Sequence, residues 1–444
     1  MKHKFLFILL FSLVLEGMVT TQAVAGDYVH QVNTLIGTKG TGLTSGYLYP
    51  GATYPYGMVQ FTPSYFSKRS GFVINQLSGG GCEHMGNFPT FPVKGKLKMS
   101  PDNILNYRIN VSEEKGHAGY YEAMVQEDIK AKLTVTERTG MASYEYPADQ
   151  QYGTIIIGGG ISATPIEQAA IVITAPNKCE GYAEGGNFCG LRTPYKVYFV
   201  AEFDTDAFET GTWKREELMP NTTFAEGEYS GVYFTFDVNK KKNIQYKIGV
   251  SYVSVENARE NLKAENAEWD FQKIQNQAEA KWNHYLGMIE VEGTNPDRTT
   301  QFYTHLYRSF IHPNVCSDVN GEYMGADFRV HKSRSKHYTS FSNWDTYRTQ
   351  IQLLSMLDPE VASDIVISHQ LFAEQSGGSF PRWVMANIET GVMQGDPTPI
   401  LIANAYAFGA RNYDPKPIFK IMRKGAEEPV SYTHLRAHET DQYL

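Results

Sequence analysis

The chain contains few cysteines and has no excess of basic residues. Its 444 residues include 4 cysteines, and no two of them form a Cys-x-x-Cys pair of the kind used in zinc and redox sites. The 40 Lys and Arg are outnumbered by 48 Asp and Glu, for a net charge of -8. This balance offers no basic surface for phosphate backbones or anionic lipid. We therefore expect no nucleic-acid partner.

The motifs of two common hydrolase classes are also missing. There is no Gly-x-Ser-x-Gly and no His-Glu-x-x-His, so serine hydrolase and zinc protease mechanisms have no support. Residues 158–163 (GGGISA) formally fit a dinucleotide-binding fingerprint. Pro165 and a further strand-like run at 170–174 leave no room for the helix that would hold a pyrophosphate. We expect a glycine-rich turn between strands here.

Only one long apolar run is present, at the N-terminus. Lys2 and Lys4 precede an apolar core at 5–15, and the small residues at 23–25 suit cleavage before Gly26. An apolar core of this length is too short to span a bilayer. We predict a signal peptide at 1–25, export to the periplasm or medium, and no stable membrane span after cleavage.

The rest of the chain changes from strand-like to helix-like periodicity. Residues 26–255 contain short alternating or buried runs separated by turn residues, which predicts a β-sandwich domain. Residues 256–287 form a helical linker, with Ser254 as its expected N-cap. A strand is expected at 288–292, within a helical region at 288–429. Helices are predicted from Pro296 to a stop at Pro313 and at 343–357, 359–375, 397–408 and 416–425.

This order of elements indicates a β-sandwich, a helical linker and the first part of an incomplete helical barrel. Residues 430–440 (VSYTHLRAHET) resemble the translation of a transposon adapter used in sequencing libraries. We therefore treat 430–444 as an adapter-derived artefact and expect the parent protein to be longer. Cys179 and Cys189 flank a glycine-rich segment. The sequence does not decide whether these two cysteines form a disulfide across a hairpin, because spacing does not fix the distance between their Cα atoms.

Aromatic and charged residues gather at an expected helix start. Trp344, Asp345 and Arg348 combine a ring face, an acceptor and a donor, the mixture that binds sugar rings and hydroxyls. The structural alternative is that Asp345 serves the first helical turn and Arg348 pairs with it. Arg382 and Trp383 follow a glycine pair in a predicted loop, where ligand contacts concentrate.

Other polar residues have stronger structural explanations. Asp396 before Pro397 suits an N-cap, and Asn320-Gly321 suits a hairpin turn better than a calcium loop. His305 and His312 are expected to be core or surface residues. Glu374 and Glu389 are the nearby glutamates, and their spacing assigns neither of them a catalytic role.

Several segments together resemble glycoside hydrolase family 92, the calcium-dependent exo-α-mannosidases of bacteria. They occur in the family's order from Asp27 to about Lys424, and they include 32–37 (VNTLIG), 49–62 (YPGATYPYGMVQFT), 137–147 (ERTGMASYEYP), 254–262 (SVENARENL), 312–318 (HPNVCSD), 341–348 (FSNWDTYR), 381–383 (PRW) and 395–397 (GDP). The loop at 79–87 (GGGCEHMGN) resembles a sandwich loop that reaches over the active site, although Glu83, His84 and Met85 depart from the family's pattern.

The resemblance implies a β-sandwich packed on an (α/α)6 barrel, with mannose-containing glycans as partners. It also implies inverting hydrolysis by two carboxylates, and Ca²⁺ bound to hydroxyls of the terminal mannose. The family's catalytic acid and base and its main calcium ligands correspond to positions beyond Pro429. The resemblance therefore assigns no catalytic residue and no metal ligand to this chain. It makes Trp344, Asp345, Arg348, Arg382 and Trp383 the candidate sugar contacts.

These expectations define one leading hypothesis and two alternatives. The parent protein is expected to remove terminal α-linked mannose, with an α-1,2 preference, and this chain by itself to be inactive. The first alternative is a non-catalytic carbohydrate-binding or surface glycan-assembly protein. The second is another sandwich-plus-barrel enzyme, a phosphorylase or polysaccharide lyase, for which the sequence offers no basic phosphate cradle.

Overall fold

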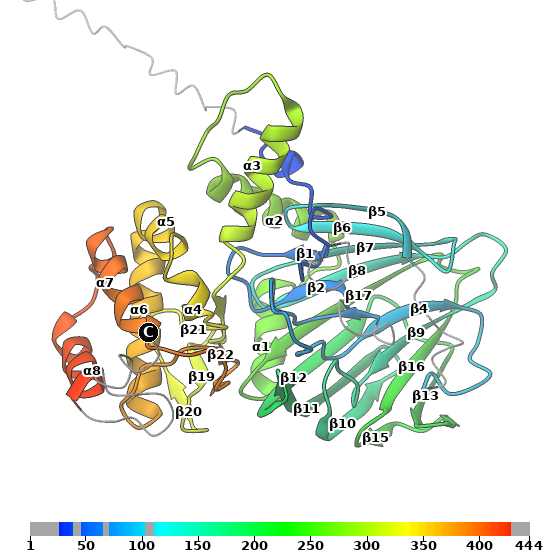
Figure 1. The fold of residues 1–444 in the computed structure, drawn as a ribbon. Helices are drawn as coiled ribbons and strands as arrows, with labels where there is room; N and C mark the ends of the chain where they lie inside the picture. Colours follow the sequence, from blue (N-terminus) through cyan, green and yellow to red (C-terminus); the bar gives the residue numbers. More distant parts are fainter. Residues whose placement is uncertain (1–25, 39–45, 65–70, 103–110, 428–444) are drawn as a thin grey trace, which may run out of the picture.

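The computed structural model describes residues 26–38, 46–64, 71–102 and 111–427. A β-rich part is followed by two connecting helices and then by a mainly helical part (Figure 1). The predicted signal peptide at 1–25 and the adapter-like segment at 430–444 lie outside the described residues. No helix in the described ranges has both the length and the apolar character needed to cross a bilayer.

Within the described chain, one sheet has eight strands in the spatial order β1-β2-β3-β4-β9-β16-β13-β14, all pairs antiparallel. In its centre, Ile156 of β9 pairs with Phe91 of β4 on one side and with Tyr233 of β16 on the other. The strands are β1 Ala52–Thr53, β2 Gln60–Pro63, β3 Phe72–Val73, β4 Thr90–Lys94, β9 Tyr152–Gly158, β13 Glu209–Lys214, β14 Glu217–Pro220 and β16 Ser230–Asp237.

The second sheet has nine strands among the described residues, in the order β15-β10-β11-β12-β17-β8-β7-β6-β5, again antiparallel. Its connections are mostly between sequence neighbours, which fits the closely spaced turns in the sequence. The strands are β5 Val111–His117, β6 Tyr120–Val125, β7 Ile129–Val135, β8 Thr139–Glu145, β10 Ile166–Ala175, β11 Lys178–Phe188, β12 Leu191–Phe203, β15 Phe224–Glu226 and β17 Asn243–Ser251.

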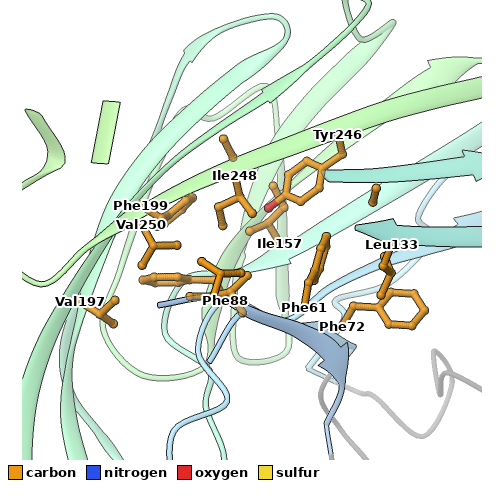
Figure 2. Packing of buried hydrophobic residues seen from close by; sticks show 14 of the residues in the cluster. Phe61, Phe72, Phe88, Leu133, Ile157, Val197, Phe199, Tyr246, Ile248 and Val250 are labelled. Atoms are coloured by element: carbon orange, nitrogen blue, oxygen red, sulfur yellow. The ribbon is translucent and has the colours of Figure 1, made fainter. Parts of the chain in front are cut away.

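A continuous apolar core joins the two sheets (Figure 2). Phe61 and Phe88 come from the first half of the β-rich part, whereas Phe199 and Tyr246 come from β12 and β17. The Phe88 and Phe199 rings lie 4.2 Å apart between centroids. Because successive strand side chains point to opposite faces, the alternating burial of β6 puts only every second residue into this core. The β-rich part is therefore a two-layer sandwich.

The glycine-rich segment after β9 is a turn, as predicted. It joins β9 directly to β10 with no helix between them. A Cβ on Gly160 would lie 1.9 Å from the carbonyl oxygen of Gly227, so only glycine allows this approach of two backbones. The segment is therefore a packing device rather than a dinucleotide site.

The disulfide pairing differs from the hairpin bridge considered from the sequence. Cys189 is bonded to Cys82, with their Cα atoms 5.2 Å apart, while Cys179 is buried and unbonded. The segment between Cys179 and Cys189 is not a turn but almost the whole of the strand β11. At about 3.3 Å per residue, its ends are on the order of 30 Å apart, far beyond disulfide reach.

Two helices connect the sandwich to the helical part. Helix α1 (Val255–Glu265) begins at Ser254, whose side chain accepts a hydrogen bond from the Asn257 amide, as the sequence predicted. It packs on β12 and β17, and α2 (Phe271–Leu286) packs on β6, β7 and β8. The buried indole of Trp282 donates a hydrogen bond of 2.7 Å to the Thr53 carbonyl oxygen. These contacts fix α2 to the sandwich.

The helical part follows the predicted pattern with some corrections. The predicted strand at 288–292 is wrong, because this segment makes no strand pairing. The predicted helix at 343–357 is interrupted at Thr349, whose φ of 66° is left-handed and unfavourable for a β-branched residue. The helices are α3 Pro296–Ser309, α4 Asn343–Thr346, α5 Gln350–Leu357, α6 Pro359–Gln375, α7 Pro397–Ala407 and α8 Pro415–Glu427, after the short 3-10 helix η1 Val29–Gln31 near the N-terminus.

Helix α6 contacts α5, α7 and α8, which places it at the centre of the helical part (Figure 1). Closure of these helices into an (α/α)6 barrel stays a prediction. Asn320 and Gly321 lie in a tight turn, with Gly321 at a φ of 85°, but the predicted hairpin is wrong, because the strands before and after this turn pair with other strands. Three two-stranded ladders occur in the described helical part: β18 Asn314–Val315 with β21 Tyr338–Thr339, β19 Glu322–Met324 with β20 Val330–Lys332, and β22 Val384–Met385 with β23 Ile388–Glu389.

Candidate functional site

A cavity of about 560 Å³ lies between the sandwich and the helical part. The sandwich contributes the loop at 77–82 and the turn after β11. The helical part contributes the end of α3, the start of α4 and the loops around β22 and β23. The polar and aromatic wall residues used below are Ser78, Phe188, His312, Ser342, Asp345 and Trp383.

The sandwich loop is held in shape by His84 and by the disulfide. His84 Nδ1 donates 2.7 Å to the Cys82 carbonyl oxygen, and its Nε2 accepts from the Leu77 amide at 2.8 Å. Burial lowers the pKa of His84 to about 4, so its ring is neutral at pH 7. The bond from Cys82 to Cys189 ties this loop to the end of β11. The loop resembling an active-site cover therefore does line the cavity.

His312 joins the two parts of the molecule at the cavity. Its Nε2 accepts a hydrogen bond of 2.8 Å from the Ser78 amide, and its Nδ1 faces Asn314 Oδ1 at 2.7 Å. The Asn314 amide in turn donates to the Gly57 carbonyl oxygen. Burial lowers the pKa of His312 to about 4. The neutral ring thus connects a sandwich loop to the segment after α3.

Among the described residues that line the cavity, Asp345 is the one with a carboxylate. Its carboxylate accepts a hydrogen bond from the Ser342 hydroxyl, at the N-terminal end of α4. Ser342 and Trp383 form an isolated antiparallel bridge, which brings Asp345 and Trp383 to the same wall. The backbone pairing, not sequence spacing, therefore unites these two predicted residues.

Trp383 forms an aromatic surface with a residue of the sandwich. Its ring stacks on Phe188 with centroids 4.5 Å apart and an interplanar angle of 26°. Both side chains line the cavity. Both side chains are largely buried and each ring covers part of the other, so together they give the wall an apolar patch. Such a patch beside a carboxylate suits the apolar and hydroxyl groups of a sugar.

Trp344 and Arg348 lie outside the cavity wall as described. The Trp344 side chain is exposed, and Arg348 Nε donates 2.7 Å to the hydroxyl of Tyr347. In the described chain Arg348 thus contacts Tyr347 rather than Asp345, so the structural alternative of an Asp345–Arg348 pair is not observed. The structure separates these two residues from the cavity that Asp345 lines.

Arg382 is buried beneath the wall rather than exposed on it. Its Nε donates 2.6 Å to the Val392 carbonyl oxygen, while its Nη1 is buried without a hydrogen-bond partner among the described residues. Glu389 accepts hydrogen bonds from the amides of Arg382, Trp383 and Gly391, and burial raises its pKa. Glu389 therefore holds the loop that carries Trp383.

Sequence reasoning did not single out Phe188 or the Ser78–His312 contact. Phe188 directly precedes Cys189, so the correct disulfide pairing would have placed it beside the loop at 77–82. The described cavity wall does not fit a calcium ion, because Ca²⁺ takes six to eight oxygen ligands and the wall offers one carboxylate, Asp345. Inverting hydrolysis likewise requires two carboxylates.

Comparison with known proteins assigns the chain to a protein family. The profile of the glycosyl hydrolase family 92 N-terminal domain matches residues 31–251, and that of its catalytic domain matches residues 257–444. An uncharacterized secreted glycosidase of Arthroderma benhamiae is 26% identical over 384 residues, which cover 76% of this chain and 48% of that protein.

Solved structures show the same arrangement. A family 92 α-mannosidase from Bacteroides thetaiotaomicron, also solved with mannoimidazole, matches with a TM-score of 0.83 and 25% identity over 91% of this chain and 58% of its own. An inverting family 92 mannosidase of that bacterium shares the fold, with a TM-score of 0.81 and 24% identity over 94% of this chain and 58% of its own. This chain thus spans about half the length of these relatives. It belongs to glycoside hydrolase family 92.

Proposed function

We propose that the protein removes terminal α-linked mannose from glycans and that the cavity between its two parts holds the mannosyl ring. The observation that carries this proposal is the wall shared by Asp345, Trp383 and Phe188. It combines a hydrogen-bond acceptor with a stacked aromatic surface. The family 92 α-mannosidase with a mannoimidazole complex supports the substrate class.

In this proposal Asp345 accepts hydrogen bonds from sugar hydroxyls, and Trp383 with Phe188 takes an apolar face of the substrate. Arg382 stands behind the wall, where its Nη1 is buried with no hydrogen-bond partner among the described residues, and we propose that it donates to the bound sugar. We propose Trp344, in α4, and Arg348, just after it, as further sugar contacts, although neither lines the described cavity wall. We assign no acid, no base and no calcium-dependent step to these residues.

Several finer features are part of the same proposal. We propose inversion at the anomeric carbon, a preference for the α-1,2 linkage, and calcium dependence of the complete catalytic centre. We also propose that the chain of 444 residues binds the sugar without cleaving it, because the described wall holds one carboxylate where inversion requires two.

The test compares the chain with the product of the complete open reading frame. Each is incubated with α-1,2-, α-1,3- and α-1,6-linked mannobiose in calcium or in chelator, and released mannose is measured. The proposal expects release by the complete product in calcium and none in chelator. Binding is measured by titrating mannoimidazole into the 444-residue chain and its D345A variant. Absence of mannose release from every linkage contradicts the proposed activity.

A second candidate function is carbohydrate binding without hydrolysis. The single carboxylate of the described wall favours it. It predicts that mannobiose binds to the complete product and is recovered intact, with or without calcium. Saturable binding together with no cleavage would select this function over the first.

A further inference from the structure

Two histidines and a glutamate from three separate elements meet on the side of the sandwich where α2 packs. His30 lies in η1, His117 ends β5, and Glu279 lies in α2. One ligand atom from each lies within 4.8 Å of the others. None of the three lines the cavity described above. The cluster is therefore separate from the candidate sugar site.

The three side chains are close enough to one another to hold one metal ion. His117 Nε2 and Glu279 Oε1 are 2.8 Å apart, and the rings of His30 and His117 are 4.6 Å apart between centroids. In a tetrahedral zinc site, ligand atoms at about 2.05 Å from the metal are about 3.3 Å from one another. Small side-chain rotations would bring the present spacing to that value.

Neighbouring groups orient these side chains. Asp27 Oδ1 lies 2.6 Å from Nδ1 of His30, which leaves Nε2 of that ring as the ligand atom. Gln275 donates 2.7 Å to Glu279 Oε1. A carboxylate on the far nitrogen of a ligating histidine is the usual support of a zinc site, because it fixes the tautomer and the ring direction.

The backbone around the cluster is already anchored. The amides of Tyr28 and Val29 both donate to Asn283 Oδ1 of α2, at 2.9 and 3.0 Å. His117 and Glu279 are largely buried, whereas His30 is more than half exposed. The site would therefore have two sheltered ligands and one ligand open to solvent, through which an ion can enter.

We propose that His30, His117 and Glu279 bind one Zn²⁺ ion, with water in the fourth position, and that the ion cross-links the N-terminal segment to β5 and α2. The imidazole and carboxylate donors favour Zn²⁺ over Ca²⁺, which prefers oxygen ligands alone. The ion's role is structural: it stabilises the junction between the sandwich and the connecting helices.

The test uses the 444-residue chain without a polyhistidine tag, stripped with chelator. ZnCl₂ is titrated by calorimetry, and thermal unfolding is followed with Zn²⁺, with Ca²⁺ and with EDTA. We expect one Zn²⁺ per chain and an unfolding midpoint that rises with Zn²⁺, returns with EDTA and does not respond in the same way to Ca²⁺. A wild-type chain that takes up no stoichiometric Zn²⁺, or that responds equally to Ca²⁺, overturns the proposal.

Variants locate the site. H30A, H117A and E279Q are expected to weaken Zn²⁺ binding at least about tenfold, and D27N, which alters only the supporting carboxylate, by about 10- to 100-fold. The matched control is H331A, which removes a histidine from another His–carboxylate pair, with Asp327, and should bind Zn²⁺ like wild type. Circular dichroism checks that each variant is folded. Unchanged Zn²⁺ affinity in folded H30A and D27N overturns the assignment.

Discussion

The Ser78 amide donates a hydrogen bond of 2.8 Å to Nε2 of His312, and this contact joins the sandwich loop to the helical part at the candidate sugar site. The acceptor nitrogen must be unprotonated. Burial keeps it so by lowering the pKa of His312 to about 4. The geometry of the cavity is thus coupled to the protonation state of a buried histidine.

Acid should therefore weaken the fold below about pH 6.5. The folded chain holds the pKa of His312 and His84 near 4, below the ordinary value of 6.5, so the unfolded chain binds more protons between these values. The free energy of unfolding should fall as the pH drops from 6.5 to 4, by up to about 1.4 kcal/mol per pH unit for each histidine. Urea unfolding at several pH values measures the slope.

H312Q should reduce the dependence of the unfolding free energy on pH by up to about 1.4 kcal/mol per pH unit, which corresponds to one proton. H305A, at an exposed position on α3, should retain the wild-type dependence. An H312Q chain with the wild-type slope would show that this histidine is not held neutral by the fold.

Asp345→Ala should separate function from folding. The side chain is exposed at the cavity, and among the described residues its hydrogen bond is the local one from Ser342, so we expect the free energy of unfolding to change by about 1 kcal/mol or less. Loss of a charged acceptor for sugar hydroxyls should weaken binding by about 1.5–3 kcal/mol, roughly 10- to 150-fold. Calorimetric titration with mannoimidazole and urea unfolding of the same preparation give both values. Lost stability with unchanged affinity would make Asp345 structural.

The disulfide should stabilise the chain and connect specific peptides. Peptide mapping without reduction should find Cys82 joined to Cys189, with Cys179 and Cys316 alkylated only after unfolding. Because the bond spans 107 residues, C82A should lose about 2–4 kcal/mol of unfolding free energy. C179A is the control that leaves the bond intact. A peptide joining Cys179 to Cys189 would refute the observed pairing.

Replacing either of two tryptophans by alanine should lower the free energy of unfolding by very different amounts. Trp282 is completely buried between α2 and β1 and donates to the Thr53 carbonyl, so W282A should cost about 3–5 kcal/mol of unfolding free energy. Trp344 is 39% exposed, and W344A should cost about 1 kcal/mol or less. Denaturant unfolding of the two variants tests the contrast. Equal losses would mean that α2 is not fixed to the sandwich as described.

Local patterns were sufficient for much of the secondary structure. The cap at Ser254, the helix start at Pro296 and the range of α6 depend on neighbours a few residues away, and all three are confirmed. The predicted helix at 343–357 is divided in the structure. Thr349 is held in a left-handed conformation that no local preference favours, and this break separates α4 from α5.

The sequence by itself determined the order of a strand-rich part, connecting helices and a helical part, because periodicity and capping act over a few residues. Only the tertiary structure decided which cysteine bonds to Cys189, that Phe188 stacks on Trp383, and which predicted residues line the cavity. The physical reason is that these contacts join segments far apart in the sequence, by 107 residues in the case of the disulfide. They form only when strand pairing and core packing bring those segments together, and no local pattern encodes that.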